Sequence, residues 1–195
     1  MKKQYSLTKR LTAIIRLHDL KEFPTSVWLR KNGYAPLANE ISRNGGYIYW
    51  AKYFNLPMSN CATRMGMKYE QMCSETLVEM GLDVKRSSVK HPYDILTTAA
   101  VKIDVKSSHL YTAPDGSKFF SFNLEKALPT ADFFVCYCVG EFEKIEKVYV
   151  LPDTTICGNT QVSVGLISSS YDRYINRWDL IKELVDFKKK IRGQL

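Results

Sequence analysis

The pattern of hydrophobic residues changes near Leu56-Pro57, and this change divides the chain into two parts that favour different folds. Residues 1–56 lack the alternation of a β-strand and instead favour short helices separated by turn signals. The turn signals are Phe23-Pro24, Asn32-Gly33 and Asn44-Gly45-Gly46. We predict helices over 7–20, 25–31, 36–42 and 47–54. The aromatic residues of the last one, Tyr47, Tyr49, Trp50 and Tyr53, are expected to face the core, which their spacing favours; the alternative is that they stack on nucleic-acid bases.

Charge follows the same division. The chain carries a net charge of +8, and residues 1–66 hold 11 basic and 3 acidic side chains, which leaves 17 of each sign for residues 67–195. A basic folded segment joined to a neutral one is typical of a polyanion-binding module attached to a second function. We therefore predict a helix-turn-helix-like DNA-binding module over residues 1–58. The side chains expected to contact the phosphate backbone are Lys31, Arg43, Lys52 and Arg64.

The second part has a mixed α/β pattern. A predicted helix over 67–80 ends at Gly81, which suits the position after a helix C-terminus. Strands are expected over 82–86, 94–98, 101–107, 118–124, 133–139 and 147–151, with a turn at Pro114-Asp115-Gly116 and a helical or irregular crossover near 124–129. An amphipathic helix over 178–191 closes the chain and is either packed on its own core or a dimer surface.

Chemistry is suggested by residues that alternate along one of these strands. Asp104 and Lys106 lie two residues apart, so their side chains share one face of the strand, and Ile103 and Val105 share the other. Asp94 begins the preceding strand. Burying a carboxylate and an ammonium beside each other is costly in a plain core, which favours a functional site. The alternative is a surface ion pair with Asp94 as a turn residue.

A third carboxylate comes from the helix expected before these strands. On a helical wheel, Glu70 lies at the edge of the hydrophobic stripe that contains Cys73 and Leu77. Glu75 and Glu79 fall on the solvent side of the same helix. Only Glu70 is therefore expected to look toward the strands.

Asp94 followed by Asp104-Val105-Lys106, with Glu70 upstream, resembles the PD-(D/E)xK nuclease superfamily. The resemblance implies an α/β, restriction-endonuclease-like αβββαβ core over residues 62–168, preceded by a small all-helical domain and followed by a C-terminal helical segment, 169–195. Residues 66–81 are similar in spacing to the archaeal Holliday-junction resolvase branch. Residues 132–135 and 148–152 look like the branch that contains intron homing endonucleases, and residues 33–56 resemble helical DNA-binding repeats attached to homing endonucleases.

The resemblance also implies roles for the site residues. Phosphodiester hydrolysis by this superfamily requires Mg²⁺, with Mn²⁺ expected to substitute, and carboxylates favour such hard cations over zinc. Asp94, Asp104 and the carbonyl of Val105 are the expected metal ligands. Lys106 would position or deprotonate the attacking water, and Glu70 would bind a second metal ion or orient a water molecule.

The function predicted from these features is Mg²⁺-dependent cleavage of double-stranded DNA by a site-specific endonuclease of the homing or restriction type, acting as a homodimer. The alternatives are a Holliday-junction resolvase or another structure-selective repair nuclease, an RNA nuclease, and a non-catalytic DNA-binding protein on the same fold. No P-loop or serine-hydrolase motif is found. Five cysteines without C-x-x-C spacing favour reduced thiols in a cytoplasmic protein. No apolar run is long enough to span a bilayer, so no membrane segment is expected. When bound to DNA, the protein is expected to be associated with the nucleoid.

Overall fold

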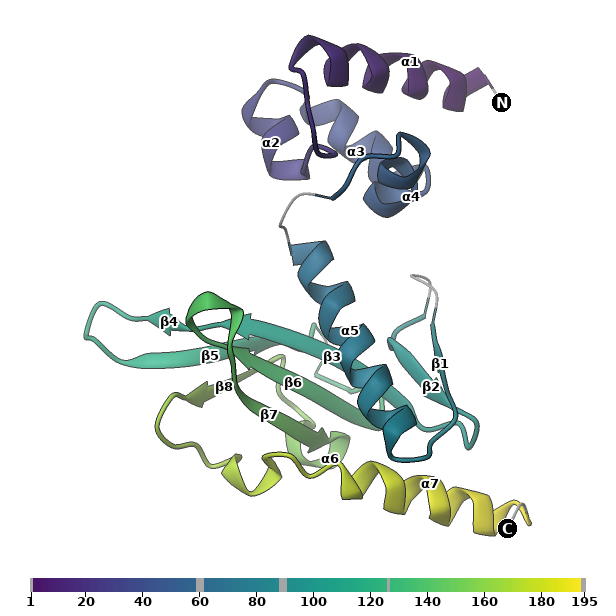
Figure 1. Ribbon diagram of the computed structural model, residues 1–195. Helices are drawn as coiled ribbons and strands as arrows, with labels where there is room; N and C mark the ends of the chain where they lie inside the picture. The colour runs from purple at the N-terminus through teal and green to yellow at the C-terminus, as the bar shows by residue number, and fades with distance from the viewer. Residues whose placement is uncertain (1, 59–61, 88–90, 126, 194–195) are drawn as a thin grey trace. The chain divides into compact units, whose positions relative to one another are not determined.

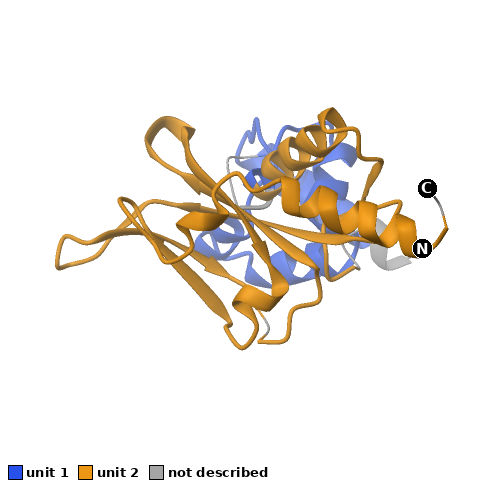
Figure 2. Cartoon of the chain, turned by 90° about the horizontal axis from the view of Figure 1, so that it is seen from below, with its two compact units in different colours: residues 1–65 blue, residues 66–195 orange. Residues whose placement is uncertain are grey.

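A computed structural model of the chain describes residues 2–58, 62–87, 91–125 and 127–193. The chain folds into two compact units, residues 1–65 and residues 66–195 (Figure 2). Each unit has its own hydrophobic core, so the two are described in turn.

The first unit is entirely helical, as predicted (Figure 1). Its helices are α1 (Lys2–Leu17), α2 (Ser26–Lys31), α3 (Ala35–Arg43) and α4 (Gly46–Tyr53). The hydroxyl of Thr25 caps α2 by accepting a 3.0 Å hydrogen bond from the backbone N–H of Trp28. Gly33, at φ +84°, makes the tight turn between α2 and α3. Leu7, Leu29 and Trp50 are fully buried at the centre of this unit.

The second unit contains a five-stranded mixed sheet in the order β1-β2-β3-β6-β7. Its strands are β1 (Val84–Arg86), β2 (Ile95–Thr97), β3 (Lys102–His109), β6 (Phe133–Val139) and β7 (Ile145–Pro152). Neighbouring strands are antiparallel except β3 and β6, which run parallel. The helix that precedes the sheet, α5 (Ala62–Glu79), begins before the boundary between the two units. This mixed α/β architecture confirms the predicted fold class.

A second, three-stranded sheet joins residues that are distant in sequence. It has the order β4-β5-β8, with β4 (Tyr111–Thr112), β5 (Lys118–Asn123) and β8 (Gln161–Gly165). The predicted turn at Asp115 connects β4 to β5, and its carboxylate accepts a 2.9 Å hydrogen bond from the N–H of Ser117. The segment from Leu124 to the start of β6 contains no helix among its described residues, so the crossover takes the irregular of the two expected forms.

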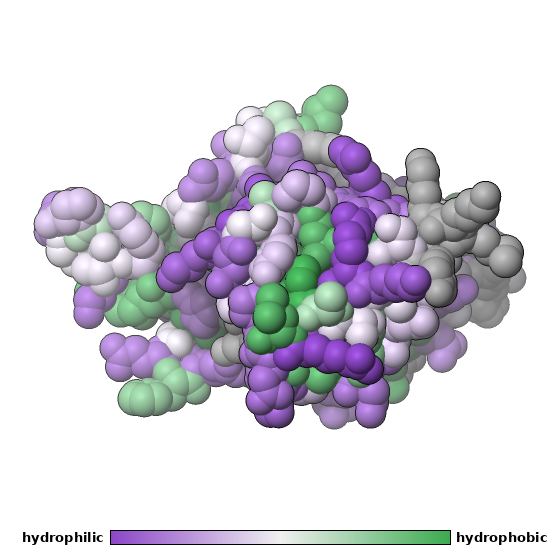
Figure 3. Space-filling view, turned by 90° about the horizontal axis from the view of Figure 1, so that it is seen from above, coloured by the Kyte–Doolittle hydropathy of each residue, from purple (hydrophilic) through white to green (hydrophobic). Residues whose placement is uncertain are grey.

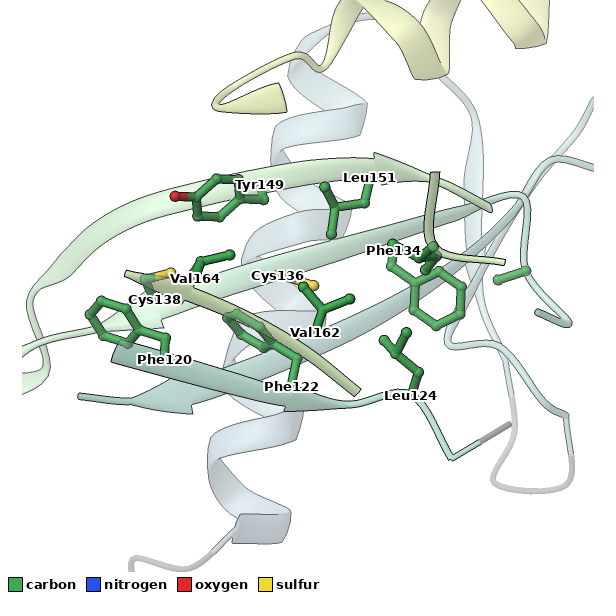
Figure 4. Packing of buried hydrophobic residues seen from close by; sticks show 12 residues of the cluster. Phe120, Phe122, Leu124, Phe134, Cys136, Cys138, Tyr149, Leu151, Val162 and Val164 are labelled. Carbon is green, nitrogen blue, oxygen red and sulfur yellow. The ribbon is translucent and has the colours of Figure 1, made fainter. Parts of the chain in front are cut away.

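The two faces of the five-stranded sheet pack against different elements. Phe134, Cys136 and Cys138 of β6 pack against Phe120 and Phe122 of the second sheet (Figure 4). On the opposite face, the ring of Tyr137 stacks on that of Tyr69 from α5, with the centroids 5.0 Å apart. Every residue of β6 is buried, which explains its continuous apolar sequence.

Short helices and a long final helix complete the second unit. The short ones are η1 (Glu141–Glu143), α6 (Asp153–Ile156) and η2 (Asp172–Tyr174), and the final one is α7 (Asp179–Ile191). Ile181 and Val185 of α7 are buried. The ammonium of Lys188 lies 3.0 Å from a carboxylate oxygen of Asp132, which fixes α7 to the start of β6.

Candidate active site

The strand β3 presents Asp104 and Lys106 on one face, as its alternation predicts. Asp104 is paired with Phe134 of β6 and Lys106 with Cys136, so both point to the face that carries the second sheet. The side chains are 13% and 22% exposed, and Nζ of Lys106 lies 2.8 Å from Oδ1 of Asp104. The ammonium and the carboxylate therefore form a close ion pair. Oδ1 of Asp104 is buried, and the Lys106 ammonium is the cation beside it.

Asp94 lies directly before β2 begins, beside the part of β3 that β2 does not pair with. Its backbone N–H donates to the carbonyl of Ile103 (2.9 Å), and its Oδ2 accepts a hydrogen bond from the N–H of Val105 (2.7 Å). The N–H and C=O of one residue in an extended strand point to the same side. The carbonyl of Val105 therefore points to the edge where the Asp94 carboxylate lies.

Glu70 comes from α5, which covers the opposite face of the sheet from Asp104 and Lys106. Its carboxylate accepts a 2.7 Å hydrogen bond from the guanidinium of Arg86, at the end of β1. The same guanidinium donates to the side chain of Gln71 at 3.1 Å. As predicted, Glu70 is only partly exposed at the edge of the buried stripe of α5, but its carboxylate is bound by an arginine.

Charge interactions link these groups through Asp94. Burial raises the pKa of Asp94, its backbone hydrogen bond opposes this, and the negative charge of Glu70 raises the pKa further. Burial also raises the pKa of Asp104 to about 6, although the ammonium of Lys106 opposes the shift. For Lys106 itself, burial alone would lower the pKa, but the carboxylates of Asp104, Glu125 and Asp94 raise it overall. Lys106 is therefore a firmly charged cation at neutral pH.

Two residues near the site were not expected from the sequence. The charge of Glu125 acts on both Asp104 and Lys106, and its backbone has φ +66°, which is uncommon for a residue with a side chain. Arg86 contacts Glu70, as described above. The sequence feature that could have predicted a cation beside Glu70 was its position at the edge of the buried stripe, because a partly buried carboxylate usually pairs with a cation.

The arrangement differs from a preformed metal cage. Within the described ranges, no three histidine, cysteine, aspartate or glutamate side chains are grouped closely enough to hold a metal ion by themselves. Asp94 and Asp104 nevertheless offer two carboxylates beside β3, close enough for the charge of Asp94 to raise the pKa of Asp104. Mg²⁺ is commonly held by one or two carboxylates together with water and substrate phosphate. These residues therefore fit a hard divalent cation, while the predicted roles of Glu70, Val105 and Lys106 stay predictions.

The predicted phosphate-contacting residues lie on the surface of the helical unit. Lys31, Arg43, Lys52 and Arg64 are all exposed, and Arg64 donates a 3.2 Å hydrogen bond to the carbonyl of Met58. Arg43 lies in a groove of about 600 Å³ along α3, which is lined by Pro36, Asn39, Glu40, Arg43 and Asn44. On the face shown in Figure 3, hydrophilic side chains surround a strip of hydrophobic ones. Because all four cations are exposed, each is accessible to a phosphate group. Their assignment as DNA contacts stays a prediction.

The expectation that the aromatic residues of α4 all face the core is wrong for two of them. Trp50 is fully buried, and its indole N–H donates to the carbonyl of Asn44 at 2.8 Å. Tyr49 and Tyr53, however, are 42% and 56% exposed, and their rings stack on each other with centroids 6.4 Å apart. Because α4 has two turns only, its aromatic residues cover more of the helix circumference than one core face can bury.

Comparisons with known proteins support the fold. No described helix has the length and apolar character needed to cross a membrane. No protein-family model matches the chain, and neither does any curated protein. Among solved structures, the chain is similar to a bacterial homing endonuclease, I-Ssp6803I, with a TM-score of 0.53 and 19% sequence identity; the match covers 68% of this chain and 99% of the other. The chain therefore shares its fold with this endonuclease.

Proposed function

We propose that this protein is a metal-dependent DNA endonuclease whose active site lies at the open edge of β3. The observation that carries the proposal is the arrangement of Asp94, Asp104 and Lys106, two partly buried carboxylates and an ammonium at one strand edge. The similar fold of a protein described as a homing endonuclease supports it. The resemblance of Asp94 and Asp104-Val105-Lys106 to the PD-(D/E)xK sequence pattern also supports the proposal.

Asp94, Asp104 and the carbonyl of Val105 would hold the cation, Mg²⁺ or in its place Mn²⁺. When bound, the divalent ion lowers the pKa of water and neutralises charge that builds on the phosphate. The charge of Asp94 raises the pKa of Asp104, so the two carboxylates lie close enough to repel each other, and a divalent cation held by both would offset that repulsion.

The remaining side chains would act directly on the phosphodiester and the attacking water. Lys106 donates hydrogen bonds to the phosphate oxygens and orients the water molecule that attacks phosphorus, and it stabilises the negative charge of the transition state. Once Arg86 turns toward the phosphate, Glu70 would be free to bind a second cation or to orient a water molecule. Arg86 is suited to that contact because a guanidinium binds phosphate oxygens through two parallel hydrogen bonds.

The helical unit would supply affinity for duplex DNA. Its exposed cations, Lys31, Arg43, Lys52 and Arg64, contact the phosphate backbone, so binding falls steeply with salt. An attached DNA-binding unit favours a site-specific enzyme of the homing or restriction type over a nuclease that recognises DNA shape alone. Because each chain carries one such site, cutting both strands requires two copies, arranged with the two-fold symmetry of the duplex.

The proposal is tested with supercoiled plasmids that carry a randomised duplex segment, incubated with the full chain and either Mg²⁺ or a chelator. The wild-type chain should nick or linearise a subset of plasmids only with Mg²⁺. Asp104→Ala and Lys106→Ala should each lower the cleavage rate by about 100-fold or more, while DNA binding in a gel-shift assay persists. Glu79→Ala, an exposed residue on the outer side of α5, is the matched control and should cut at the wild-type rate.

Three outcomes would overturn parts of the proposal. Wild-type cleavage by both active-site variants would refute the site. DNA binding by the wild-type chain without cleavage of any plasmid would indicate a non-catalytic DNA-binding protein. Preferential cleavage of a four-way junction or of single-stranded RNA would support the proposed phosphodiester hydrolysis but refute duplex DNA as the preferred substrate.

A further inference from the structure

The C-terminal helix α7 carries a second apolar stripe beside the one that packs on its own unit. Ile181 and Val185 are buried, whereas Phe187 and Ile191 are 60% and 69% exposed. Leu180 and Leu184, both half-buried, continue the exposed stripe toward the helix N-terminus. The stripe residues are spaced by four, three and four positions, which is the spacing of the contact positions in paired helices.

Charge along α7 is divided between its two halves. All three acidic residues fall in the first part of the helix, together with one basic residue, Lys182, and the remaining basic residues follow at its end: Asp179, Glu183 and Asp186, then Lys188, Lys189 and Lys190, with Arg192 directly after the helix. Glu183 and Lys190, both exposed, lie on the same flank of the exposed stripe. The helical period places Lys190 on the flank of Glu183, whereas Lys188, which pairs with Asp132, falls on the other flank of the stripe.

We propose that the exposed stripe of α7 pairs with the α7 helix of a second copy of this chain in an antiparallel, two-fold symmetric contact. Antiparallel pairing brings the acidic half of each helix beside the basic half of the other, whereas parallel pairing brings like charges together. With the two-fold axis between Leu184 and Phe187, Glu183 of one copy lies near Lys190 of the partner subunit, and the symmetry repeats the pair.

The chemistry of the stripe favours this occupant over DNA. A duplex would meet the carboxylates of Asp179, Glu183 and Asp186 on the same helix that presents the apolar residues, and like charges repel. A helix of 13 residues is only about 20 Å long at about 1.5 Å per residue. The contact is therefore at the small end of stable interfaces, and a dissociation constant on the order of micromolar is expected. The inference does not depend on the proposed nuclease activity, because it concerns association alone.

The experiment measures the mass of the full chain by sedimentation equilibrium over a range of concentrations, roughly 1 to 100 μM around the expected dissociation constant. The wild-type chain should shift from monomer to dimer across this range. Phe187→Glu should remain monomeric throughout. Glu183→Lys and Lys190→Glu should each weaken the dimer by about tenfold, and the double variant should restore it, because the two charges exchange places. Lys182→Glu, on the far side of α7, is the charge-matched control and should not change association.

Several results would overturn the inference. A wild-type chain that stays monomeric at the highest concentration excludes the contact. A dimer that survives Phe187→Glu places the interface elsewhere. Loss of association in both single charge variants without recovery in the double variant would show that Glu183 and Lys190 do not face each other. Circular dichroism of each variant checks that a lower measured mass reflects dissociation of the dimer and not unfolding of the chain.

Discussion

Replacing Asp104 by asparagine should stabilise the metal-free protein while removing its activity. Burial raises the pKa of this carboxyl from 3.8 to about 6. The folded protein therefore binds the Asp104 proton more tightly than the unfolded chain does, and ionising the group costs stability. Each pKa unit corresponds to about 1.4 kcal/mol, so the cost at pH 8 is about 3 kcal/mol. Asparagine resembles the neutral acid in shape and carries no charge, so it avoids this cost.

The pH dependence gives the sharper test of the same variant. An acid whose pKa is raised by folding stabilises the folded protein while the acid is protonated. This stabilisation is complete below the pKa of the unfolded chain and is lost as the pH rises through the pKa of the folded protein, here between about pH 4 and pH 6. The advantage of Asp104→Asn should therefore shrink from about 3 kcal/mol at pH 8 to about 1 kcal/mol at pH 4.5. At about 2–4 °C per kcal/mol, the melting temperature at pH 8 should rise by roughly 6–12 °C.

The assay is urea and thermal unfolding with a chelator present, followed by circular dichroism. Asp115→Asn is the control of opposite sign, because Asp115 is exposed and its hydrogen bonds from Ser117 lower its pKa. Added Mg²⁺ should stabilise the wild-type chain and not Asp104→Asn, since only a folded state with the full ligand set gains from binding. An Asp104→Asn variant that is no more stable than wild type at pH 8, or whose advantage is constant with pH, would refute the reasoning.

Four further predictions concern individual side chains. Arg86→Met should lower the cleavage rate by about 10- to 100-fold, with partial recovery in Arg86→Lys, in single-turnover assays; equal rates in all three proteins would contradict the role. Tyr69→Phe should raise the free energy of unfolding by about 1 kcal/mol because its buried hydroxyl has no hydrogen-bond partner among the described residues. Tyr149→Phe, which removes a 2.7 Å hydrogen bond to a carboxylate, should lower it by a similar amount. Lys31→Ala and Arg43→Ala should each reduce the slope of log K against log salt for duplex binding by about 0.9, and an unchanged slope would remove that phosphate contact.

The local features of the candidate site could be predicted from the sequence because strands and helices have fixed periods. Alternation alone places Asp104 and Lys106 on one face of β3, and the helical period alone places Glu70 at the edge of the buried stripe. The start of α2 and the turn between α2 and α3 follow from short-range signals, Thr25 and Gly33, whereas the first helix, predicted over 7–20, runs from Lys2 to Leu17. These are interactions between residues a few positions apart.

The remaining features depend on contacts between distant residues. β8 was not predicted, although Val162 and Val164 alternate with polar residues, because five residues are a short signal and the strand forms by pairing with β5, about 40 residues earlier in the chain. The hydrogen bond from Val105 to Asp94 and the binding of Glu70 by Arg86 likewise need the finished sheet.

The sequence by itself therefore determined which side chains carry charge and which face of an element they share. Only the tertiary structure decided which of those charges meet. Burial decided as well which of them change their pKa, since desolvation and Coulomb interactions depend on distance in space rather than along the chain. The sequence therefore names three carboxylates, whereas the tertiary structure shows that the charge of Asp94 interacts with Glu70 and also with Asp104 and Lys106.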